Sequence, residues 1–475
     1  MPFLGSRPRW RQHQTLLTAL CALSSLSISL ILLFWYAVNS DRSYLHPLLT
    51  QIIPAGHCAC ESATVFQCDS CLTCSHQTLS LTPSPETWEF EYARDGSNAG
   101  LSRDQCAAAF PGLFEDISRA GNFWRTQGGG LSRAELDTIP LNPGMARAQI
   151  LNGELYVVAA RARTEDHRRK ILAALSAMHR ALVTDGGRAS RRAAIEFIFS
   201  IEDKLSDVAD ATDPVWTLSR AAEEEAAWLM PDFGFWAWDH AHTEIGPYDA
   251  VVEDAVGYDG LAWEEKTQKL VWRGKPSFAP KLRRALLDKT RGVEWADVQA
   301  VDWHRHDQEV DEGEKGNVLG MGEHCRYGFI AHVEGRSYSA SLKYRQACRS
   351  VIVAHKLQYI QHHHYLLISS GPSQNYVEVE RDFSDLEEKL TPLLADREEA
   401  QRIADNSVRT FRERYLTRAA EACYWRELWN GYATVFNSTS IGEDINAKQG
   451  RNARGLRYES FVLRGSEAMM EFDAR

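Results

Sequence analysis

The chain has 475 residues, and 44% of them are apolar, which is enough to build two ordinary hydrophobic cores. Its formal charge is −11 at neutral pH, and it contains no long run of lysine or arginine. A nucleic-acid-binding surface needs a basic stripe, so the composition argues against DNA or RNA as a partner.

The N-terminal part contains an uncharged, mostly apolar run over residues 16–38, long enough to span a bilayer as a helix. Three arginines lie within residues 1–15, and the basic flank of such a helix tends to stay in the cytoplasm. We therefore expect a cytoplasmic tail over 1–15, a signal anchor over 16–38 and a lumenal remainder, as in a single-pass type II membrane protein. A cleavable signal peptide is the alternative, but the run exceeds a usual signal core and lacks a small-residue cleavage site.

Nine of the ten cysteines follow this run, and in an oxidising lumen they are expected to form disulfides. Six of them crowd residues 58–106, where 39–105 reads as a stem and cysteine-rich lead-in. Their C-x2-C-x2-C spacing is also compatible with zinc, although bridges are favoured in this compartment. Because nine is odd, one thiol is free or pairs between chains. Asn437 begins the glycosylation sequon Asn-Ser-Thr and is expected to be modified in the secretory route.

Periodic patterns then predict helices over 112–125 and 163–182 and a short strand over 194–201. Glu202 and Asp203 follow at the carboxyl end of this strand. In open α/β sheets that end faces the ligand cleft, so these carboxylates are candidate site residues.

A second strand, 269–272, is broken by Arg273-Gly274-Lys275-Pro276, and a helix is expected from 279 to 287. Residues 325–356 then read as strand, loop, helix and strand. The small side chains between Ser337 and Ser341 let backbone N–H groups reach an anion, and Lys343 on the first helical turn adds a positive charge. This pattern predicts a site for the diphosphate of a nucleotide-sugar. Residues 385–432 are mostly helical, and the polar stretch from Asn437 is expected to be loose.

Six motifs carry a resemblance, in this order: FPGLFEDI near Phe110, FSIED ending at Asp203, LMPDFGFWAW from Leu229, WRGK at Trp272, HCRYGFIAHVEGRSYSASLKY at His324 and CYWRELW at Cys423. From about Cys106 to Val435 the chain resembles the lumenal glycosyltransferases of family 90, which include fungal capsule-associated xylosyltransferase-like proteins and animal protein O-glucosyltransferases. The resemblance implies an α/β fold of the GT-B type, with two Rossmann-like lobes facing a central cleft. The expected divisions are an N-terminal acceptor lobe over 106–255, a C-terminal nucleotide-sugar lobe over 256–405, a return helix over 406–436 and a polar tail over 437–475.

The resemblance gives Asp203 the role of catalytic base, which deprotonates the acceptor hydroxyl on the face opposite the departing nucleotide. Position alone favours a simpler role for Asp203, as the cap of a following helix. Glu202 and Asp207 are the other candidates for the base.

On the donor side, Arg273 matches a diphosphate-contacting arginine, and its planar fork suits two phosphate oxygens. Lys343 falls where animal members carry a second phosphate-binding arginine, so it keeps the charge but loses the bidentate geometry. The remaining donor-binding candidates are Gly274, Ser277, Gly335, Ser339 and Ser341. Ser339 and Ser341 are also suited to capping the helix, and the two roles are compatible.

No cofactor is expected to be required, and UDP-sugar is the donor substrate. The acidic Glu-Arg-Asp element of animal members is missing over 275–280, so we expect transfer without a metal ion. Asp302, Asp307 and Asp311 leave a divalent metal site open. Residues 362–364 are three consecutive histidines, which cannot easily share one ion because neighbouring side chains point in different directions.

On the acceptor side, the resemblance assigns Asp232, Phe233 and Trp236 to the cleft, although aromatic residues here are as often part of a core. The kinase-like Asp-Phe-Gly triplet lacks the other kinase motifs. The resemblance also implies a Cys325–Cys348 disulfide around the donor loop, and a bond from Cys423 to the region of Cys58.

These observations predict an inverting glycosyltransferase that moves xylose or glucose from a UDP-sugar to a hydroxyl of a protein or polysaccharide. It would act in the Golgi or endoplasmic reticulum, with its catalytic part lumenal. The alternative is a non-catalytic lumenal glycan-binding protein that retains the fold. A structural membrane-anchored adaptor is a third possibility, which the density of cleft-type residues disfavours.

Overall fold

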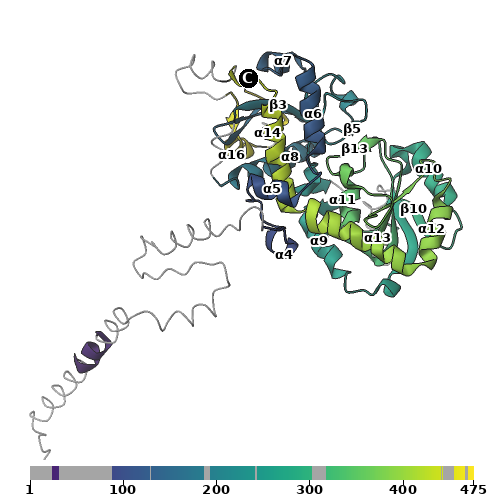
Figure 1. Ribbon diagram of the computed structural model, residues 1–475. Coiled ribbons are helices and arrows are strands. Elements are labelled where there is room, and N and C mark those ends of the chain that lie inside the picture. The colour runs from purple at the N-terminus through teal and green to yellow at the C-terminus, as the bar shows by residue number, and fades with distance from the viewer. Residues whose placement is uncertain are drawn as a thin grey trace, which may run out of the picture. The chain divides into compact units, whose positions relative to one another are not determined.

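The computed structural model describes residues 24–31, 88–128, 130–186, 193–240, 243–301, 317–439, 441, 454–465 and 469–474 (Figure 1). Of the expected anchor over 16–38, this covers a helix at 24–31. Within the described ranges, no helix is both long and apolar enough to cross a bilayer. Glu89–Arg475 form one compact unit, distinct from Met1–Trp88.

The first sheet of this unit has seven described strands in the order β15, β2, β1, β3, β4, β6, with β16 also paired to β2. Their bounds are β1 Met145–Leu151, β2 Glu154–Arg161, β3 Ile195–Ser200, β4 Val215–Thr217, β6 Trp228–Leu229, β15 Leu456–Arg457 and β16 Glu471–Asp473. β1 is antiparallel to β2 and β3, whereas β3, β4 and β6 are parallel. The residues that follow β3 and β6 therefore emerge at the same edge of the sheet.

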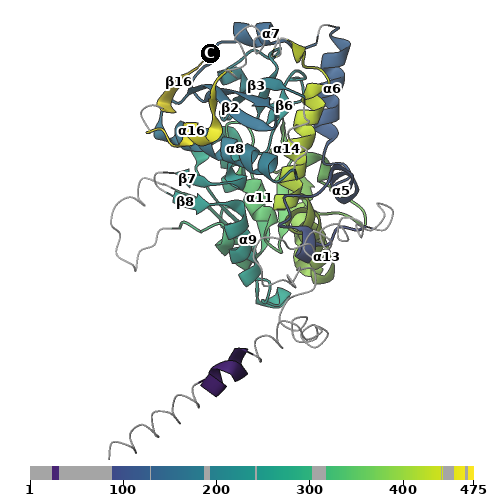
Figure 2. The same ribbon diagram turned by 90° about the vertical axis from the view of Figure 1, so that its left-hand side faces the viewer.

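Two long helices, α8 (Glu165–Val183) and α14 (Arg418–Ala433), pack together beside this sheet (Figure 2). The Thr164 side chain caps α8, and Thr417 caps α14, each by accepting a backbone N–H of the first turn. α14 buries Trp425, Trp429 and Tyr432. Burial of each such large side chain contributes about 2–3 kcal/mol, so α14 is a main element of this core although it lies late in the sequence.

The C-terminal part is ordered where the structure describes it. β15 and β16 both pair antiparallel with β2, and between them α16 (Tyr458–Val462) packs on α8, with the Tyr458 hydroxyl 2.6 Å from Ser176 Oγ (Figure 2). The expectation of a loose tail is therefore wrong for residues 454–465 and 469–474. These strands have only two and three residues, too few for an alternating pattern to stand out.

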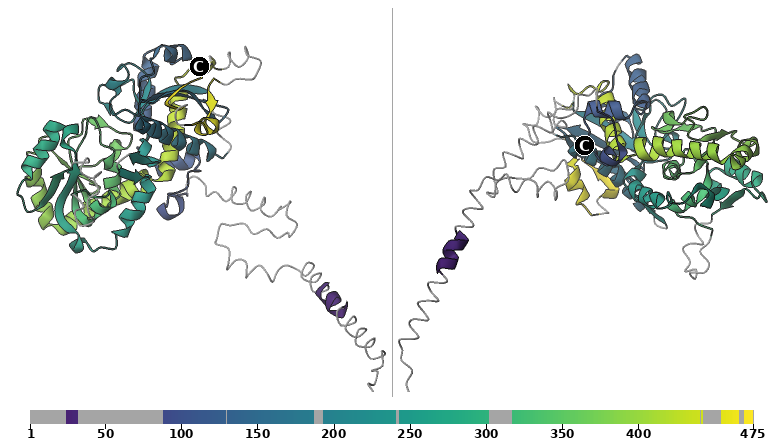
Figure 3. Two further views of the ribbon diagram at one scale, coloured as in Figure 1. Left: turned by 180° about the vertical axis from the view of Figure 1, so that it is seen from behind. Right: turned by 60° about the horizontal axis from the view of Figure 1, so that its bottom comes forward.

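The second sheet is wholly parallel, in the order β10, β9, β11, β12, β14. Its strands are β9 Thr267–Gly274, β10 Ala296–Ala300, β11 Tyr327–His332, β12 Val351–His355 and β14 Val377–Val379. The helices α10 (Pro280–Lys289), α12 (Leu386–Ala395) and α13 (Arg397–Thr410) surround it (Figures 1 and 3). The continuous burial of β11 after its first residue, and of all of β12, is typical of strands covered on both faces.

The strand order creates a switch point between β9 and β11. From β9 the chain runs through α10 to β10 on one side, and then returns to β11 on the other side of β9. In open α/β sheets, ligands bind beyond the carboxyl ends of the strands at such a point. The loops after Gly274 and His332 are therefore where a ligand is expected.

The other described elements are short or connect these layers. The helices are α4 Tyr92–Asp95, α5 Arg103–Ala109, α6 Glu115–Thr126, α7 Arg133–Thr138, α9 Tyr248–Gly257 and α11 Ser341–Gln346, with short turns η3 Leu205–Asp207, η4 Phe233–Phe235, η5 Trp263–Glu265, η6 Pro276–Phe278, η8 Gly322–Arg326, η9 His364–Leu366 and η10 Phe411–Tyr415. Two ribbons pair β5 Arg220–Ala221 with β13 Tyr359–Ile360, and β7 Trp238–His240 with β8 Thr243–Gly246. The helices and strands that the sequence predicted up to residue 432 are confirmed in type.

Candidate functional site

The loops after β9 and β11 are held together by a buried arginine, Arg283 of α10. Its Nη1 donates to the carbonyl of Lys275 at 2.7 Å, and its Nε donates to the carbonyl of Glu334 at 3.0 Å. One guanidinium thus fixes the backbone beyond two neighbouring strand ends. Residues 334–341, which we call the donor loop, therefore lie against the end of β9.

Close packing within the donor loop explains its glycine. The Gly335 N–H donates to the Tyr338 carbonyl at 3.2 Å, and a Cβ on Gly335 would lie 3.3 Å from that oxygen and 3.4 Å from Arg283 Nη2. The hydroxyls of Ser339 and Ser341 are 2.9 Å apart, and helix α11 begins after Ala340 without a side-chain cap. The two serines therefore bond to each other rather than capping the helix.

A buried carboxylate fixes the start of this loop. Both Gln358 and Tyr359 donate their backbone N–H to Glu334 Oε1 at 2.9 Å, and Arg381 donates to Oε2 at 2.7 Å. The Glu334 side chain is 2% exposed. Because its charge is fully satisfied inside the protein, Glu334 positions the loop and is not a candidate ligand for a metal or a substrate.

Two buried arginines near the donor loop, Arg283 and Arg345, form no salt bridge with an acid of the described residues, although the charge of Asp203 acts on Arg283 from a distance. Arg345, on α11, hydrogen-bonds only to His332 Nδ1, at 3.3 Å, and its Nε has no partner. Burial, and then the neighbouring Arg283, lowers the pKa of Arg345 to about 9. Burial lowers the pKa of Arg283 to about 10. An unpaired buried cation is costly, so this pair of arginines favours a bound anion.

The expected donor ligand Arg273 is occupied by the protein. Its Nη2 lies 2.9 Å from both carboxylate oxygens of Asp297 on β10, and its Nε donates to the Asn317 carbonyl at 2.6 Å. Nη1 donates to the carbonyls of Trp272 and Asp297. All of the hydrogen-bonding nitrogens of this side chain are satisfied by protein groups, so Arg273 ties β9 to β10 here.

Near Arg273, Gly274 packs against the Trp272 ring, where a Cβ would lie 2.5 Å from a ring carbon. Ser277 is exposed in η6. The donor-binding roles of both residues stay predictions.

Lys343 is also engaged, in a contact that joins the two sides of the candidate site. Its ammonium lies 2.8 and 2.9 Å from the two oxygens of Asp232 and donates to the Ala340 carbonyl at 3.1 Å. Both side chains are 1% exposed. The three N–H donors of Lys343 are thus used, and the ammonium does not reach a ligand in this arrangement.

The segment after β6 depends on this ion pair. Asp232 Oδ1 also accepts the Gly234 N–H at 2.7 Å, and the Tyr344 hydroxyl donates to the Gly234 carbonyl at 3.0 Å. A Cβ on Gly234 would lie 2.5 Å from the Tyr344 hydroxyl and 2.8 Å from Lys343 Nζ. Only glycine therefore fits at position 234, against the Tyr344 hydroxyl and the Lys343 ammonium.

The two aromatic residues predicted for the acceptor side differ in exposure. Phe233 is 4% exposed, and the Lys170 ammonium lies 5.0 Å from its ring centroid. Trp236 is 37% exposed, and the Arg180 guanidinium lies 4.9 Å from its ring. Of the two rings, only that of Trp236 is exposed, and the acceptor-side roles of both residues stay predictions.

Asp203 lies just beyond β3, and its carboxylate accepts no hydrogen bond from the described residues. It is half-buried, and burial raises the pKa of this carboxyl above its usual value. The helical turn η3 begins after Lys204 with no side-chain cap, so the alternative role of Asp203 as a cap does not apply. A carboxylate with a raised pKa and no fixed partner suits a general base.

The other two base candidates are paired. His167 Nε2 lies 3.0 Å from Glu202 Oε1, and because the Arg163 N–H donates to His167 Nδ1, the neutral imidazole carries its proton on Nε2. Arg336 Nη2 lies 2.8 Å from Asp207 Oδ2. Of the three carboxylates, Asp203 is the one left open to a substrate.

The edge of the first sheet and the donor loop of the second meet at Asp203. The Ser337 hydroxyl donates to the Asp203 backbone carbonyl, next to the Arg336–Asp207 ion pair. The open carboxylate and the donor loop therefore form one site.

Two disulfides lie in the described part of the chain. Cys325 bonds to Cys348, as the resemblance implied, and brackets β11 and the donor loop. Cys423 bonds to Cys106, with 5.6 Å between their Cα atoms, so the expected bond to the region of Cys58 is wrong. The reason is tertiary: α5, capped by Ser102, lies along α14 and brings Cys106 beside Cys423. Cys58 itself lies outside the described residues.

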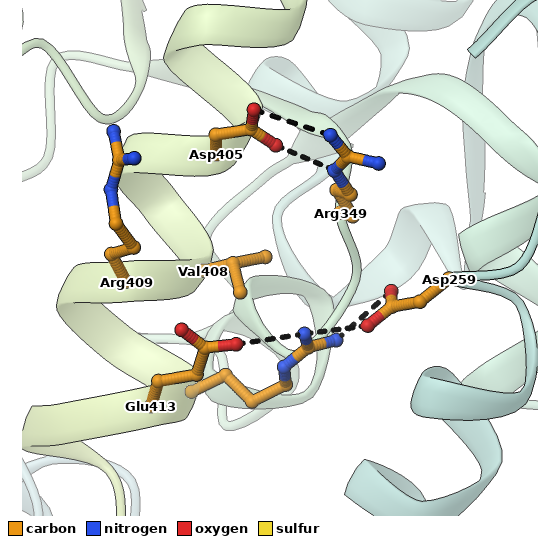
Figure 4. A pocket seen from close by; sticks show the side chains of 7 residues that line it. Asp259, Arg349, Asp405, Val408, Arg409 and Glu413 are labelled. Atoms are coloured by element: carbon orange, nitrogen blue, oxygen red, sulfur yellow. Dashed lines mark hydrogen bonds and ion pairs between the residues drawn. The ribbon is translucent and has the colours of Figure 1, made fainter. Parts of the chain in front are cut away.

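A separate cavity of about 280 Å³ lies beyond the far end of α11 and is shown in Figure 4. Arg349 pairs there with Asp405, and Arg412 pairs with Asp259 (Figure 4). Its lining is Asp259, Arg349, Asp405, Val408, Arg409, Arg412 and Glu413. The acids and arginines that line this cavity balance in charge, whereas Arg283 and Arg345 form no salt bridge with an acid of the described residues.

His362 and His363 of the histidine run are buried instead of lining the site, and His364 is half-buried. His362 packs between the rings of Phe235 and Tyr424, and both ring nitrogens of His363 lack a hydrogen-bond partner. Among the described residues, no group of three or more His, Cys, Asp or Glu side chains could hold a metal ion. The other metal candidates, Asp302, Asp307 and Asp311, lie outside the described residues.

The fold and the site define an α/β protein in which two buried arginines lie beside a loop at a sheet switch point, and that loop contacts the segment that carries an open carboxylate. The family model for glycosyl transferase family 90 matches residues 102–447, and the chain belongs to this family. This confirms the resemblance noted in the sequence. The chain is 25% identical over 199 residues to Protein O-glucosyltransferase 3 of Rattus norvegicus, a match that covers 41% of this chain and 38% of the rat protein.

Two further relatives are also protein O-glucosyltransferases. Protein O-glucosyltransferase 2 of Danio rerio is 27% identical over 180 residues, which cover 38% of this chain and 35% of the fish protein. Protein O-glucosyltransferase 1 of Rattus norvegicus is 23% identical over 251 residues, which cover 50% of this chain and 62% of the relative. The chain thus spans less than two thirds of the length of these relatives, and they support a glycosyltransferase without fixing its sugar or acceptor.

Sequence reasoning missed Arg283 and Arg345. Arg283 lies three residues before Leu286 in α10 and shares its buried face, so helical periodicity could have marked it as a buried cation. Arg345 lies two residues after Lys343, just beyond the end of that motif, and is separated from it by about 200° around the helix. Only the tertiary packing decides which of the two cations reaches an acid.

Proposed function

We propose that this protein is an inverting glycosyltransferase of the GT-B type, which transfers glucose or xylose from a UDP-sugar to a hydroxyl of a protein or polysaccharide. The observation that carries the proposal is the buried pair Arg283 and Arg345, which forms no salt bridge among the described residues and lies beside the donor loop. The open carboxylate of Asp203 lies across the Ser337 contact. Two sheets whose carboxyl edges meet at this contact support the GT-B assignment.

Asp203 would act as the base. Its carboxylate takes the proton of the acceptor hydroxyl as that oxygen forms a bond to the anomeric carbon of the sugar. The bond from this carbon to the diphosphate oxygen breaks on the opposite face, which inverts the configuration. The raised pKa of Asp203 brings the basicity of the carboxylate closer to that required at neutral pH.

Arg283 and Arg345 would stabilise the diphosphate that leaves. Their positive charges lie in a site of low polarity, where charge development on an oxygen is stabilised more strongly than in water. In this scheme Arg273, Lys343 and Glu334 position the surrounding segments. The arginines supply the charge that a metal ion would otherwise provide, so we propose that transfer is independent of divalent metal.

We further propose a type II topology, with the anchor over 16–38 and the catalytic part in the lumen of the Golgi or endoplasmic reticulum. The sequon supports a secretory location. Asn437 and Thr439 are exposed, and the Thr439 hydroxyl donates to Asn437 Oδ1 at 2.6 Å, next to the end of α14. The asparagine is therefore accessible for glycosylation.

The test is UDP release by the purified full-length chain from a panel of UDP-sugars, each with a peptide or glycan acceptor, with and without a chelator. Release from UDP-glucose or UDP-xylose that survives chelation supports the proposal. Release that requires a divalent ion overturns the metal-independent scheme, and absence of both UDP binding and release overturns the enzyme itself.

The second candidate function is a lumenal glycan-binding protein without turnover. The saturation of Arg273 and Lys343 by protein groups favours it, because the two cations expected for the donor are both engaged. This candidate predicts glycan binding that is insensitive to UDP. The Arg283 and Arg345 pair, which a pure glycan-binding site does not need, makes it the weaker of the two.

A further inference from the structure

The cavity beyond the far end of α11 has two walls that both carry charged side chains. Asp405, Arg409 and Glu413 belong to the wall formed by α13 and η10, and Arg349 and Asp259 lie across from it (Figure 4). The three residues of the first wall follow one another at four-residue spacing, which places them on one face of the helix. The cavity therefore meets a regular row of polar side chains.

The wall is shaped by a π-helical turn, η10, at the point where α13 ends. Arg412 of this turn donates to both carboxylate oxygens of Asp259, at 3.1 and 2.6 Å, and to the Ala347 carbonyl at 3.0 Å, just after α11. These bonds hold the two walls at a fixed spacing, so the cavity is preformed. Single π-helical turns are rare and frequently lie at functional sites.

The lining keeps polar atoms that no described residue satisfies. Arg412 Nε has no hydrogen-bond partner there, although its side chain is only 4% exposed. Arg349 uses Nε and Nη2 on Asp405, and its Nη1 is left over. Glu413 uses only Oε1, which accepts from Arg412 at 3.3 Å. Arg409 pairs with no acid of the described chain. Unused N–H donors thus lie next to unused carboxylate acceptors.

The charges of the lining select the class of ligand. Three arginines and three acids line the cavity, so neither a small anion nor a cation gains a net attraction. Lys266 lies near Asp259, but it donates to the Cys325 carbonyl at 2.6 Å and does not line the cavity. A sugar is neutral, and each of its hydroxyls can both donate and accept, as this lining requires. A volume of about 280 Å³ is near the lower limit for ligand cavities and suits a single sugar ring.

An aromatic ring lies near the same charges. Burial raises the pKa of the Tyr92 hydroxyl, and the charges of Arg412 and Glu413 also act on it, which places this side chain close to them. Tyr92, on α4, is 40% exposed. The C–H face of a sugar ring can pack on such a ring while the hydroxyls reach polar neighbours.

We propose that this cavity binds one neutral sugar unit of a glycan, at a site apart from the donor loop. Arg349, Arg409 and Arg412 would donate to the sugar hydroxyls, and Asp405 and Glu413 would accept from them. Such a site holds a glycan chain whether or not the protein transfers sugar, so the proposal does not depend on the proposed function.

The test is a titration of the purified full-length chain with the methyl glycosides of glucose, xylose, galactose and mannose, followed by saturation-transfer NMR. UDP is present at saturating concentration, so that a sugar that still binds does so outside the donor site. At least one of the four should bind, with a Kd of about 1 mM, because so small a ligand makes few contacts.

The variant Arg409→Gln/Glu413→Gln removes one charge of each sign from the lining and leaves the net charge and both ion pairs of the cavity in place. It should bind the glycoside at least about tenfold more weakly. Tyr92→Leu should also weaken binding. Arg397→Gln/Glu398→Gln, at exposed positions of α13 outside the cavity, is the matched control and should bind as the unaltered chain. Circular dichroism and unfolding midpoints check that the variants are folded.

Three results would overturn the proposal: no glycoside binds, UDP abolishes the binding, or Arg409→Gln/Glu413→Gln binds as tightly as the control. Displacement of the bound glycoside by inorganic phosphate would identify an anion site and would overturn it as well. Each of these results leaves the proposed function standing, because none removes UDP binding or sugar transfer.

Discussion

Lys343 of α11 and Asp232, just before η4, form an ion pair that is buried on both sides, with 2.8 and 2.9 Å between the ammonium and the two carboxylate oxygens. Sequence reasoning placed them apart, one on the donor and one on the acceptor side. The pair instead links these two sides, so the segments that would hold the two substrates share one polar contact.

The ion pair makes a first prediction about stability. Lys343→Met should lower the free energy of unfolding by about 3–5 kcal/mol, because it leaves the Asp232 carboxylate buried without a counter-charge. The double variant Lys343→Met/Asp232→Leu should lose less than the sum of the two single variants, as measured by denaturant unfolding. Lys281→Met, at an exposed position, is the control. Additive losses would show that the two side chains do not interact.

The second prediction concerns Arg345, whose replacement should raise the stability of the protein but weaken its binding of UDP. Arg345→Met should raise the free energy of unfolding of the ligand-free protein, since it removes a buried cation without an acid. It should also weaken UDP binding at least about tenfold, the loss expected for a charged hydrogen bond. Thermal unfolding and calorimetric titration with UDP give the two values. Arg284→Met, an exposed neighbour of Arg283, should change neither.

The buried histidines predict how stability depends on pH. Burial lowers the pKa of His362 and His364 to about 3 and that of His324 to about 4, and it holds those of His332 and His363 well below the usual value. These groups stay neutral in the folded protein, while the unfolded chain takes up protons below about pH 6.5. Stability should therefore be complete above pH 6.5 and fall as the pH drops toward 4, by up to about 1.4 kcal/mol per pH unit for each histidine.

Denaturant midpoints measured between pH 7 and 5 test this dependence. His363→Phe should reduce the slope of the free energy of unfolding against pH by the contribution of one titrating histidine. Neither ring nitrogen of His363 has a hydrogen-bond partner, so the substitution breaks no hydrogen bond. Stability that is flat between pH 7 and 5 would contradict the neutral, buried state of this cluster.

The Cys106–Cys423 bond predicts the effect of reduction on the first core. Its loss, in Cys106→Ser/Cys423→Ser, should cost about 2–5 kcal/mol, because the bond closes a loop of more than three hundred residues. The variant should still bind UDP, since neither cysteine lies near the donor loop. Unfolding curves of the oxidised unaltered chain and of the oxidised variant should differ by this amount, and reduction, which also breaks Cys325–Cys348, should lower the stability of both chains further.

Local patterns in the sequence located the two loops and the open carboxylate, because each depends on a strand end and the few residues after it. Asp203 follows a strand that reads clearly as β, and the donor loop follows another. The partners could not be read in the same way. Arg273 meets Asp297 only because β10 lies parallel to β9, and Lys343 meets Asp232 across 111 residues.

The same limit applies to the disulfide and to the tail. Cys106 and Cys423 are 317 residues apart, and their pairing depends on how α5 packs on α14. Helical periodicity marks which residues of a helix are buried, but it does not say which other helix covers them. The two tail strands join the sheet through backbone hydrogen bonds to β2. Almost any residue can make such bonds, so the amino-acid composition does not reveal them.

The most direct test of the central claim compares the unaltered full-length chain with Asp203→Asn, which is nearly identical in shape. UDP affinity by calorimetry and sugar transfer to an acceptor are measured on the same preparations. The variant should bind UDP with unchanged affinity and transfer sugar at a rate at least about a thousandfold lower, since the base is lost. Transfer by Asp203→Asn at a rate near that of the unaltered chain would contradict the assignment of Asp203 as the base.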